Sequence, residues 1–449
     1  MFPESRPQET LSVVDAAAII VGTVIGVGIF KTPSIVASNA ESGGMVLLFW
    51  LLGGLASFVG ALCYAELMSA YPHAGGDYHY LGRAFGSAPA FLYAWARMTV
   101  IQTGSIAMLG FLVGDYASEI LRLGPLSASL YAALTIILLT AVNVAGIRQG
   151  KGMQKTLVAC ILLGLLTASA IGILMLDPQA VFSEGRVIPE REALGTAMIF
   201  VLLTYGGWNE ASFLSAEVRS GRRNMLKVLL YSIGTVMVVY LLVNIALLNS
   251  LGRTDMAASS AVMADMMRKA FGPMGGSCAS LLILFAAAST MNAAMITGAR
   301  TGYALGQDYP ILGFLGRWHG LRHTPVNALL FQAGVALVLV ALGTGARDGF
   351  VMMVEYTAPV FWLFFLMVGI SIFLLRRKEP NVHRPFRVPL YPLTLPAFCA
   401  ICLFMLYSSL AFTGGGSFVG VCVLLTGIPL MILRKKRGMT DKRHLNAAE

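Results

Sequence analysis

The chain has 449 residues, of which 57% are hydrophobic and only 12% are charged. Soluble domains carry about twice that share of charge, so the composition excludes a soluble single-domain enzyme, a disordered chain and a small disulfide-stapled secreted domain. The net charge of +10 comes from short basic clusters between apolar runs. That distribution is typical of a multi-pass membrane protein and argues against nucleic acid as a partner.

Apolar runs of membrane-spanning length predict an all-α protein with about twelve transmembrane helices joined by short loops. The longest loops are expected around Arg253 to Pro273 and around Gln307 to Thr324. The helices are expected over residues 12–37, 44–70, 88–119, 127–147, 155–176, 193–217, 227–250, 276–303, 324–343, 349–375, 388–412 and 415–434.

The distribution of Lys and Arg predicts how the chain is oriented. Assigning successive loops to alternate sides of the membrane places about 23 of these residues on the side of the N-terminus and about 8 on the other. Cytoplasmic loops carry the excess of basic residues. We therefore expect both termini to be cytoplasmic and the protein to lie in the plasma (inner) membrane.

Two predicted spans contain glycine clusters near their middle. The first span includes Gly22-Thr23-Val24-Ile25-Gly26-Val27-Gly28-Ile29-Phe30, and the sixth includes Leu203-Thr204-Tyr205-Gly206-Gly207-Trp208-Asn209. Glycine allows the backbone to leave helical geometry, and a bilayer tolerates this only where the backbone is buried in protein or lines a cavity. Matching positions in spans one and six predict two inverted five-helix units with a broken helix in each. The alternative is close helix packing through the GxxxG pair Gly22 and Gly26.

A broken helix offers unpaired N–H groups at the start of its second half and unpaired C=O groups at the end of its first half. A zwitterionic amino acid matches both ends. The N–H groups of Gly26, Val27 and Gly28 can bind an α-carboxylate. The carbonyl groups near Ile25, and those of Tyr205 and Gly206, can accept from an α-ammonium group.

Several motifs resemble a known family. They are the first-span GTVIGVGIF, the sixth-span TYGGWN, Tyr64-Ala65-Glu66-Leu67, Gly75-Gly76-Asp77-Tyr78-His79-Tyr80 and Arg384-Pro385-Phe386-Arg387-Val388-Pro389. With them the chain resembles the amino acid–polyamine–organocation superfamily from about Leu11 to about Arg434. It is most similar to the L-type amino acid transporters and their bacterial relatives.

This resemblance implies the five-plus-five inverted-repeat fold, alternating access, and a substrate held between spans 1, 3, 6, 8 and 10. The corresponding division is an N-terminal tail over residues 1–11 and a transport core over 12–375, with repeats of about 12–176 and 193–375. Two further helices over 388–434 and a basic tail over 435–449 follow. The family also implies amino acid transport, without a catalytic residue.

Three positions depart from the family pattern. Val27 stands where the family commonly has Ser, and Leu203 followed by Thr204 stands where an aromatic gate is frequent. Ile161 stands where many members carry a lysine, which leaves room for a cation. Ser289 and Thr290 in the eighth span are hydroxyls of the kind that sodium-coupled relatives use. The alternative is that they bond to carbonyl groups of their own helix. Proton symport, sodium symport and exchange all stay open as ways of driving transport, and no cofactor other than a coupling ion is expected.

Ionisable residues within spans are costly and usually functional. Those predicted here are Glu66, Arg97, Glu210, Glu217 and Glu355. Glu66 and Glu217 are expected near cytoplasmic ends as structural or gating ion-pair partners. Arg97 is expected to face the protein interior beside a carboxylate from span six or ten. Glu210 follows the sixth-span break, where it can face the substrate or simply favour a helix start.

Other functions remain alternatives. A polyamine or amine carrier of the same fold would need an acidic pocket, for which Glu210 and Glu355 are the candidates. A membrane-embedded enzyme would have to use His73 and His79, which lack a nucleophile or metal-ligand spacing. A channel or receptor is a further class. The loop Leu121 to Ala128 contains no cysteine, so no disulfide-linked heavy chain is expected.

Overall fold

The computed structural model describes residues 9–174, 191–259, 261–344, 349–411 and 415–432. The predicted basic tail over 435–449 lies outside these ranges. Helices make up most of the described chain, in the following order: α1 (Val13–Val24), α2 (Gly28–Ser38), α3 (Gly43–Ala70), α4 (Asp77–Phe85), α5 (Ser87–Ala96), the π-helical turn η1 (Arg97–Ile101), α6 (Gln102–Ile120), α7 (Ser127–Ala145), α8 (Ile147–Leu174), α9 (Arg191–Thr204), the 3₁₀ helix η2 (Trp208–Leu214), α10 (Gly221–Ala258), α11 (Val262–Asp308), the short 3₁₀ turn η3 (Pro310–Leu312), α12 (Val326–Gly343), α13 (Gly349–Lys378), α14 (Thr394–Ala411), α15 (Gly415–Leu425) and α16 (Gly427–Ile432).

This architecture confirms a polytopic helical membrane protein. Among the described residues, nine helices are long and apolar enough to cross a membrane, and the bent pair α1–α2 can be counted as a tenth. The other two predicted spans correspond to shorter pieces, α9 with η2 and α15 with α16. Every predicted span therefore coincides with one helix or with two or three consecutive helical segments among the described residues.

One predicted loop is wrong. The segment Arg253 to Pro273 was expected as a hydrophilic loop, but it is mostly helical. The helix α10 continues past a kink at Gly252 to Ala258, and α11 already begins at Val262 and kinks at Phe271 and Gly272. The polar composition of this segment argues against a position within the membrane, but it is compatible with a helix. The two interrupting glycines have φ of 72° and 63°, values that a side chain disfavours.

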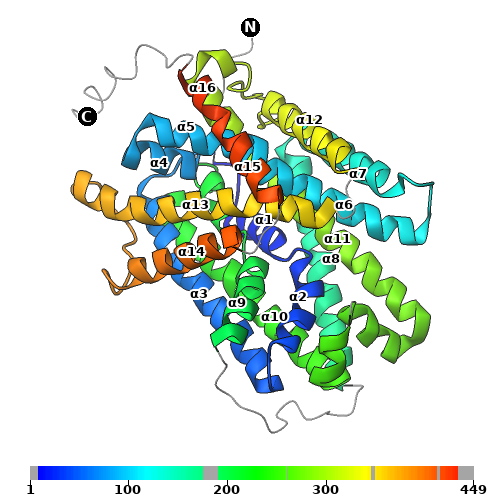
Figure 1. Ribbon diagram of the computed structural model, residues 1–449. Coiled ribbons are helices and arrows are strands. Elements are labelled where there is room, and N and C mark those ends of the chain that lie inside the picture. The colour runs from blue at the N-terminus through cyan, green and yellow to red at the C-terminus, as the bar shows by residue number, and fades with distance from the viewer. Residues whose placement is uncertain (1–8, 175–190, 260, 345–348, 412–414, 433–449) are drawn as a thin grey trace.

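The broken first span lies at the centre of the bundle. Figure 1 shows α1 in the middle of the surrounding helices, and it contacts α8, α10, α11 and η2. A capping box starts α1, in which Ser12 and Asp15 satisfy one another's backbone N–H groups. The outer surface of the bundle is apolar instead. Leu130, Leu134, Ile137 and Leu138 of α7 are all about half exposed or more, as helix faces in contact with lipid are.

Ion pairs tie together the helix ends on the predicted cytoplasmic side. Glu217 accepts from Arg300 of α11 through both carboxylate oxygens, at 2.5 and 2.8 Å, and both side chains are 1% exposed. Glu66 of α3 accepts from Arg376 at 2.6 and 2.8 Å and lies 3.5 Å from Arg384. The predicted role of Glu66 and Glu217 as ion-pair partners near this end agrees with these contacts.

We predict that Glu217→Gln destabilises the protein by about 3–5 kcal/mol, because the buried Arg300 loses its counter-charge. The matched control is Glu379→Gln, which removes an exposed pair with Arg83 at 2.8 Å and should cost about 0–1 kcal/mol. Melting temperatures of the purified protein in detergent measure both. Equal melting temperatures for the two variants would contradict the assignment of a tightly buried pair.

Candidate functional site

The first span breaks where the glycines predict it. The helix α1 ends at Val24, α2 begins at Gly28, and their axes differ by 48°. The N–H of Gly26 donates to the carbonyl of Val24 at 2.8 Å. One of the three expected carboxylate-binding N–H groups is therefore already used. At the start of α2 the N–H of Phe30 donates to the carbonyl of Val27 at 3.0 Å, so Gly28 and Ile29 hold the N–H groups that lack helical acceptors.

The sixth span breaks at the second glycine cluster. The helix α9 ends at Thr204, and Tyr205 and Gly206 still donate to Val201 and Leu203 at 2.9 and 3.1 Å. Gly207 then adopts φ 108°, which turns the chain into the 3₁₀ helix η2. The second half of this span is thus a tight 3₁₀ helix, where glycine patterning alone had left its type open.

The two breaks lie in contact with one another. A Cβ atom on Gly28 would lie 2.7 Å from the hydroxyl oxygen of Thr204, and one on Gly207 would lie 3.0 Å from a methyl carbon of Thr23. The hydroxyl groups of Thr32 and Thr204 are 2.7 Å apart. Leu203, at the predicted gate position, is 50% exposed instead, whereas Thr204 and Tyr205 are buried.

A tyrosine that the sequence analysis missed bridges the breaks. The hydroxyl of Tyr240 on α10 lies 2.9 Å from the carbonyl oxygen of Val24 and 3.2 Å from that of Thr204. One hydroxyl proton thus serves the carbonyl ends of both broken helices. The Tyr240 ring packs edge-on against Trp50 and Tyr205, with centroids 5.4 and 5.0 Å away. The only sequence signal was a phenolic hydroxyl within a predicted span, and Ser232 and Asn244 are polar residues of the same span.

The eighth-span hydroxyls lie beside the first break. Thr290 donates to the carbonyl of Gly22 at 2.8 Å and lies 3.4 Å from that of Ile25. Ser289 accepts from the side-chain amide of Gln154 at 2.9 Å. A cation needs oxygen atoms free to face it, but Gln154 presents N–H groups here. These residues therefore fit a hydrogen-bonded contact better than a sodium ion.

Arg97 and Glu210 form the main charged contact within the bundle. The guanidinium group donates to both carboxylate oxygens, at 3.0 and 2.5 Å, and the two residues are 1% and 6% exposed. It also lies 3.8 Å above the ring of Phe213. The predicted partner from span six is therefore the one found. The π-helical turn η1, which begins at Arg97, interrupts α5 and α6 at this point.

The other predicted charges lie elsewhere. Glu355 of α13 is half-buried and faces Gly416 of α15, so it does not join Arg97. Ile161 is buried on α8, while Lys155 pairs with Asp15 of α1 at 2.9 Å. Lys155, which lies on the same helix as Ile161, thus anchors the start of α1 through its ion pair with Asp15.

The histidine motif forms a packed structural pair. His73 and His79 stack with ring centroids 4.2 Å apart, and Nδ1 of His73 accepts from the N–H of Gly75 at 2.9 Å. Burial lowers the pKa of both imidazoles, so both are neutral at physiological pH. These contacts stabilise the turn that leads into α4.

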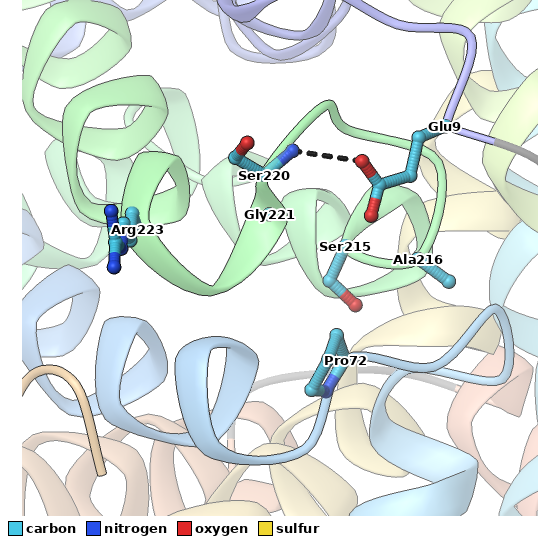
Figure 2. A pocket seen from close by; sticks show the side chains of 7 residues that line it. All are labelled: Glu9, Pro72, Ser215, Ala216, Ser220, Gly221 and Arg223. Atoms are coloured by element: carbon cyan, nitrogen blue, oxygen red, sulfur yellow. Dashed lines mark hydrogen bonds between the residues drawn. The ribbon is translucent and has the colours of Figure 1, made fainter.

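A surface hollow of about 370 Å³ opens next to the end of η2. Figure 2 shows Glu9, Pro72, Ser215 and Arg223 around it, with the N–H of Ser220 donating to the Glu9 carboxylate at 3.0 Å. Leu11 pairs with the backbone of Glu217 and Arg219 just beside it. The hollow lies on the predicted cytoplasmic side and is lined by residues other than those at the two breaks.

The amino-acid sequence matches known proteins along most of its length. Residues 11–433 match the model of a family described as amino acid permease. Large neutral amino acids transporter small subunit 2 of Mus musculus is 30% identical over 443 residues, which cover 95% of this chain and 81% of the relative. Asc-type amino acid transporter 1 of Mus musculus is 28% identical over 442 residues, with 95% and 81% covered. The b(0,+)-type amino acid transporter 1 of the same species is 28% identical over 392 residues, with 86% and 79% covered.

We predict that Gly28→Ala destabilises the protein by about 1–3 kcal/mol, because the added carbon overlaps the side chain of Thr204. The double variant Gly28→Ala/Thr204→Ala should recover part of that loss by removing the atoms that overlap. Gly334→Ala on α12, where nothing lies within 4 Å, is the matched control and should be neutral or slightly stabilising. Thermal melting in detergent decides, and a wild-type melting temperature for Gly28→Ala would contradict the close contact.

Proposed function

Because the chain belongs to the amino acid permease family, we propose that it is a secondary active transporter that carries amino acids across the plasma (inner) membrane by alternating access. One observation carries the proposal: the carbonyl ends of both broken helices meet at the hydroxyl of Tyr240. Backbone carbonyl groups from the two breaks thus converge on one side chain inside the bundle. The family and the relatives named above are transporters, which argues against an enzyme.

The breaks supply both halves of an amino acid site. The N–H groups at the start of α2 attract a carboxylate, and the helix dipole adds to that attraction. The carbonyl groups of Val24, Ile25 and Thr204 attract an ammonium group. In the present contact Tyr240 and Thr290 donate to these carbonyl groups. We propose that the substrate ammonium group replaces these donors when Gly28 and Thr204 move apart.

The charge balance favours amino acids over polyamines. A polyamine site needs carboxylates without a cation, but Glu210 is held by Arg97 through both oxygens. Glu355, the other candidate, faces α15. The surroundings of the breaks are then close to neutral, which suits a zwitterion. The names of the relatives, which specify large neutral amino acids and other amino acid systems, point the same way.

Alternating access requires one end of the bundle to be closed at a time. Three ion-pair groups join different helices on the predicted cytoplasmic side: Asp15 with Lys151 and Lys155, Glu66 with Arg376 and Arg384, and Glu217 with Arg300. We propose that these groups close this side and must separate for substrate to leave. The division into inverted repeats over 12–176 and 193–375 stays a prediction, as does the absence of a disulfide-linked heavy chain.

Uptake into proteoliposomes tests the proposal. A panel of labelled amino acids, with spermidine as a competitor, should show saturable uptake of amino acids and no competition by the amine. Tyr240→Phe should raise the apparent affinity for the substrate by up to roughly tenfold, because a hydrogen bond of about 1.4 kcal/mol no longer competes with the substrate ammonium group for the two carbonyl groups. Tyr231→Phe, an exposed tyrosine on the same helix, is the matched control. Linear, unsaturable flux would instead indicate a channel, and strong competition by spermidine would indicate an amine carrier.

Sodium dependence is tested separately. We expect equal uptake in sodium and choline buffers, because the amide of Gln154 occupies Ser289 at the place where an ion would bind. Thr290→Ala should then lower uptake to the same extent in both buffers, since it removes the bond to Gly22. Uptake that requires sodium in the wild type, and loses that requirement in Thr290→Ala, would restore the sodium site.

A further inference from the structure

A second buried carboxylate lies next to the Arg97–Glu210 pair. Asp77, the first residue of α4, is 2% exposed. Its Oδ2 accepts from the hydroxyl groups of Tyr64 on α3 and Tyr93 on α5, at 3.1 and 3.3 Å. Its Oδ1 is buried without a hydrogen-bond partner, and so is the hydroxyl oxygen of Ser212 on η2. Ser212 packs directly against the backbone of Gly76, the residue before Asp77.

The cluster has one cation for two carboxylates. Arg97 faces Asp77, but Glu210 uses two of its guanidinium nitrogens. The other ionisable groups nearby are the phenols Tyr64, Tyr93 and Tyr80, and a phenol carries no charge at physiological pH. From α13, which also packs against α4, Arg376 is paired with Glu66 and Lys378 donates to the carbonyl of Ala84. An ionised Asp77 would therefore have to share the single cation Arg97 with Glu210.

We propose that Asp77 is the proton-binding site that couples transport to the proton gradient. A proton bound at Oδ1 forms an O–H group that can donate to the unpartnered oxygen of Ser212. That single bond satisfies both orphaned atoms and makes the cluster neutral. When the proton leaves, the Ser212 hydroxyl can turn and donate to Oδ1 instead. The inference rests on the transport function proposed above and names its coupling ion.

Burial agrees with this assignment. It raises the pKa of Asp77 to about 7, although Arg97, Ser212 and Tyr64 each act to lower it. The start of α4 also favours the ionised form. The net shift places the gain and loss of the proton within the physiological range. A carboxyl group with an unshifted pKa near 4 would stay ionised there.

The position of Asp77 connects the proton to the substrate site. Ser212 and Glu210 both lie on η2, which begins directly after the sixth-span break. Suppose that a proton binds Asp77 more tightly when Gly28 and Thr204 are in contact than when they have moved apart. The proton then stabilises the contact by that difference in affinity. Tyr80 interacts with both Asp77 and Ser215, and Ser215 lines the hollow of Figure 2.

Transport in proteoliposomes tests the coupling. With a pH gradient that is alkaline inside, wild type should accumulate labelled leucine above its external concentration, by up to about tenfold per pH unit at one proton per substrate. Asp77→Asn should lose this accumulation, whereas Asp255→Asn, an exposed aspartate on α10, should keep it. Accumulation by Asp77→Asn at the wild-type level overturns the proposal.

Exchange of labelled for unlabelled leucine by wild type without a gradient tests transport itself. Its absence would reject the transport function alone.

Thermal melting gives a readout that does not depend on transport. Between about pH 4 and about pH 7 the folded protein holds a proton that the unfolded chain has lost. Its stability therefore falls as pH rises through this window and levels off above it. Asp77→Asn should lack this component, so its melting temperature should rise relative to wild type across the window. Parallel curves for the two proteins overturn the proposal.

A second variant covers the case in which Asp77→Asn does not fold. Ser212→Ala removes the hydroxyl that lowers the pKa of Asp77, so the pH at which stability levels off should move upward. An unchanged pH profile of Ser212→Ala overturns the assignment of the proton to Oδ1.

Discussion

Backbone N–H and C=O groups have no partner in hydrocarbon, and this constraint organises the molecule. Two spans interrupt their own hydrogen bonding, α1–α2 at Ile25 to Val27 and α9–η2 at Tyr205 to Gly207. Each interruption is tolerated because the other break and the side chains of α10 and α11 surround it. Tyr240 and Thr290 donate to carbonyl groups in the last turn of α1. The bundle is therefore polar at its centre and apolar on the outer surface that faces lipid.

Buried charges are under the same constraint, because each of them also needs a partner. A buried ion pair contributes little net stability, but a buried charge that loses its partner is costly. Arg97 with Glu210 and Arg300 with Glu217 satisfy this condition through two-point contacts. Asp77 does not, because two tyrosine hydroxyls are its only hydrogen-bond partners at Oδ2 and Oδ1 has none. An unbalanced carboxylate in an otherwise balanced interior is the feature on which the proposed proton coupling rests.

Much of this arrangement was predictable from local patterns. Apolar runs located the spans, because the thickness of the bilayer sets their length. The glycine clusters located both breaks, because only a residue without a side chain enters the required conformations cheaply, as Gly207 does with φ 108°. The depth of Arg97 within a span predicted a carboxylate partner. Polar composition misled at Arg253 to Pro273, since it reports exposure to water and says little about helix formation.

The sequence by itself determined which segments cross the membrane, where two of them break, and that Arg97 needs a carboxylate. Each of these follows from the period, length or charge of one segment. Only the tertiary structure decided which carboxylate Arg97 meets, that Tyr240 bridges the two breaks, and that Gln154 reaches Ser289. It also decided that Asp77 has to share the single cation Arg97 with Glu210. These contacts join residues from 36 to more than 200 positions apart, and their formation depends on how the helices rotate and pack. No local pattern encodes that rotation, because every apolar face of a membrane helix can turn equally well toward lipid or toward protein.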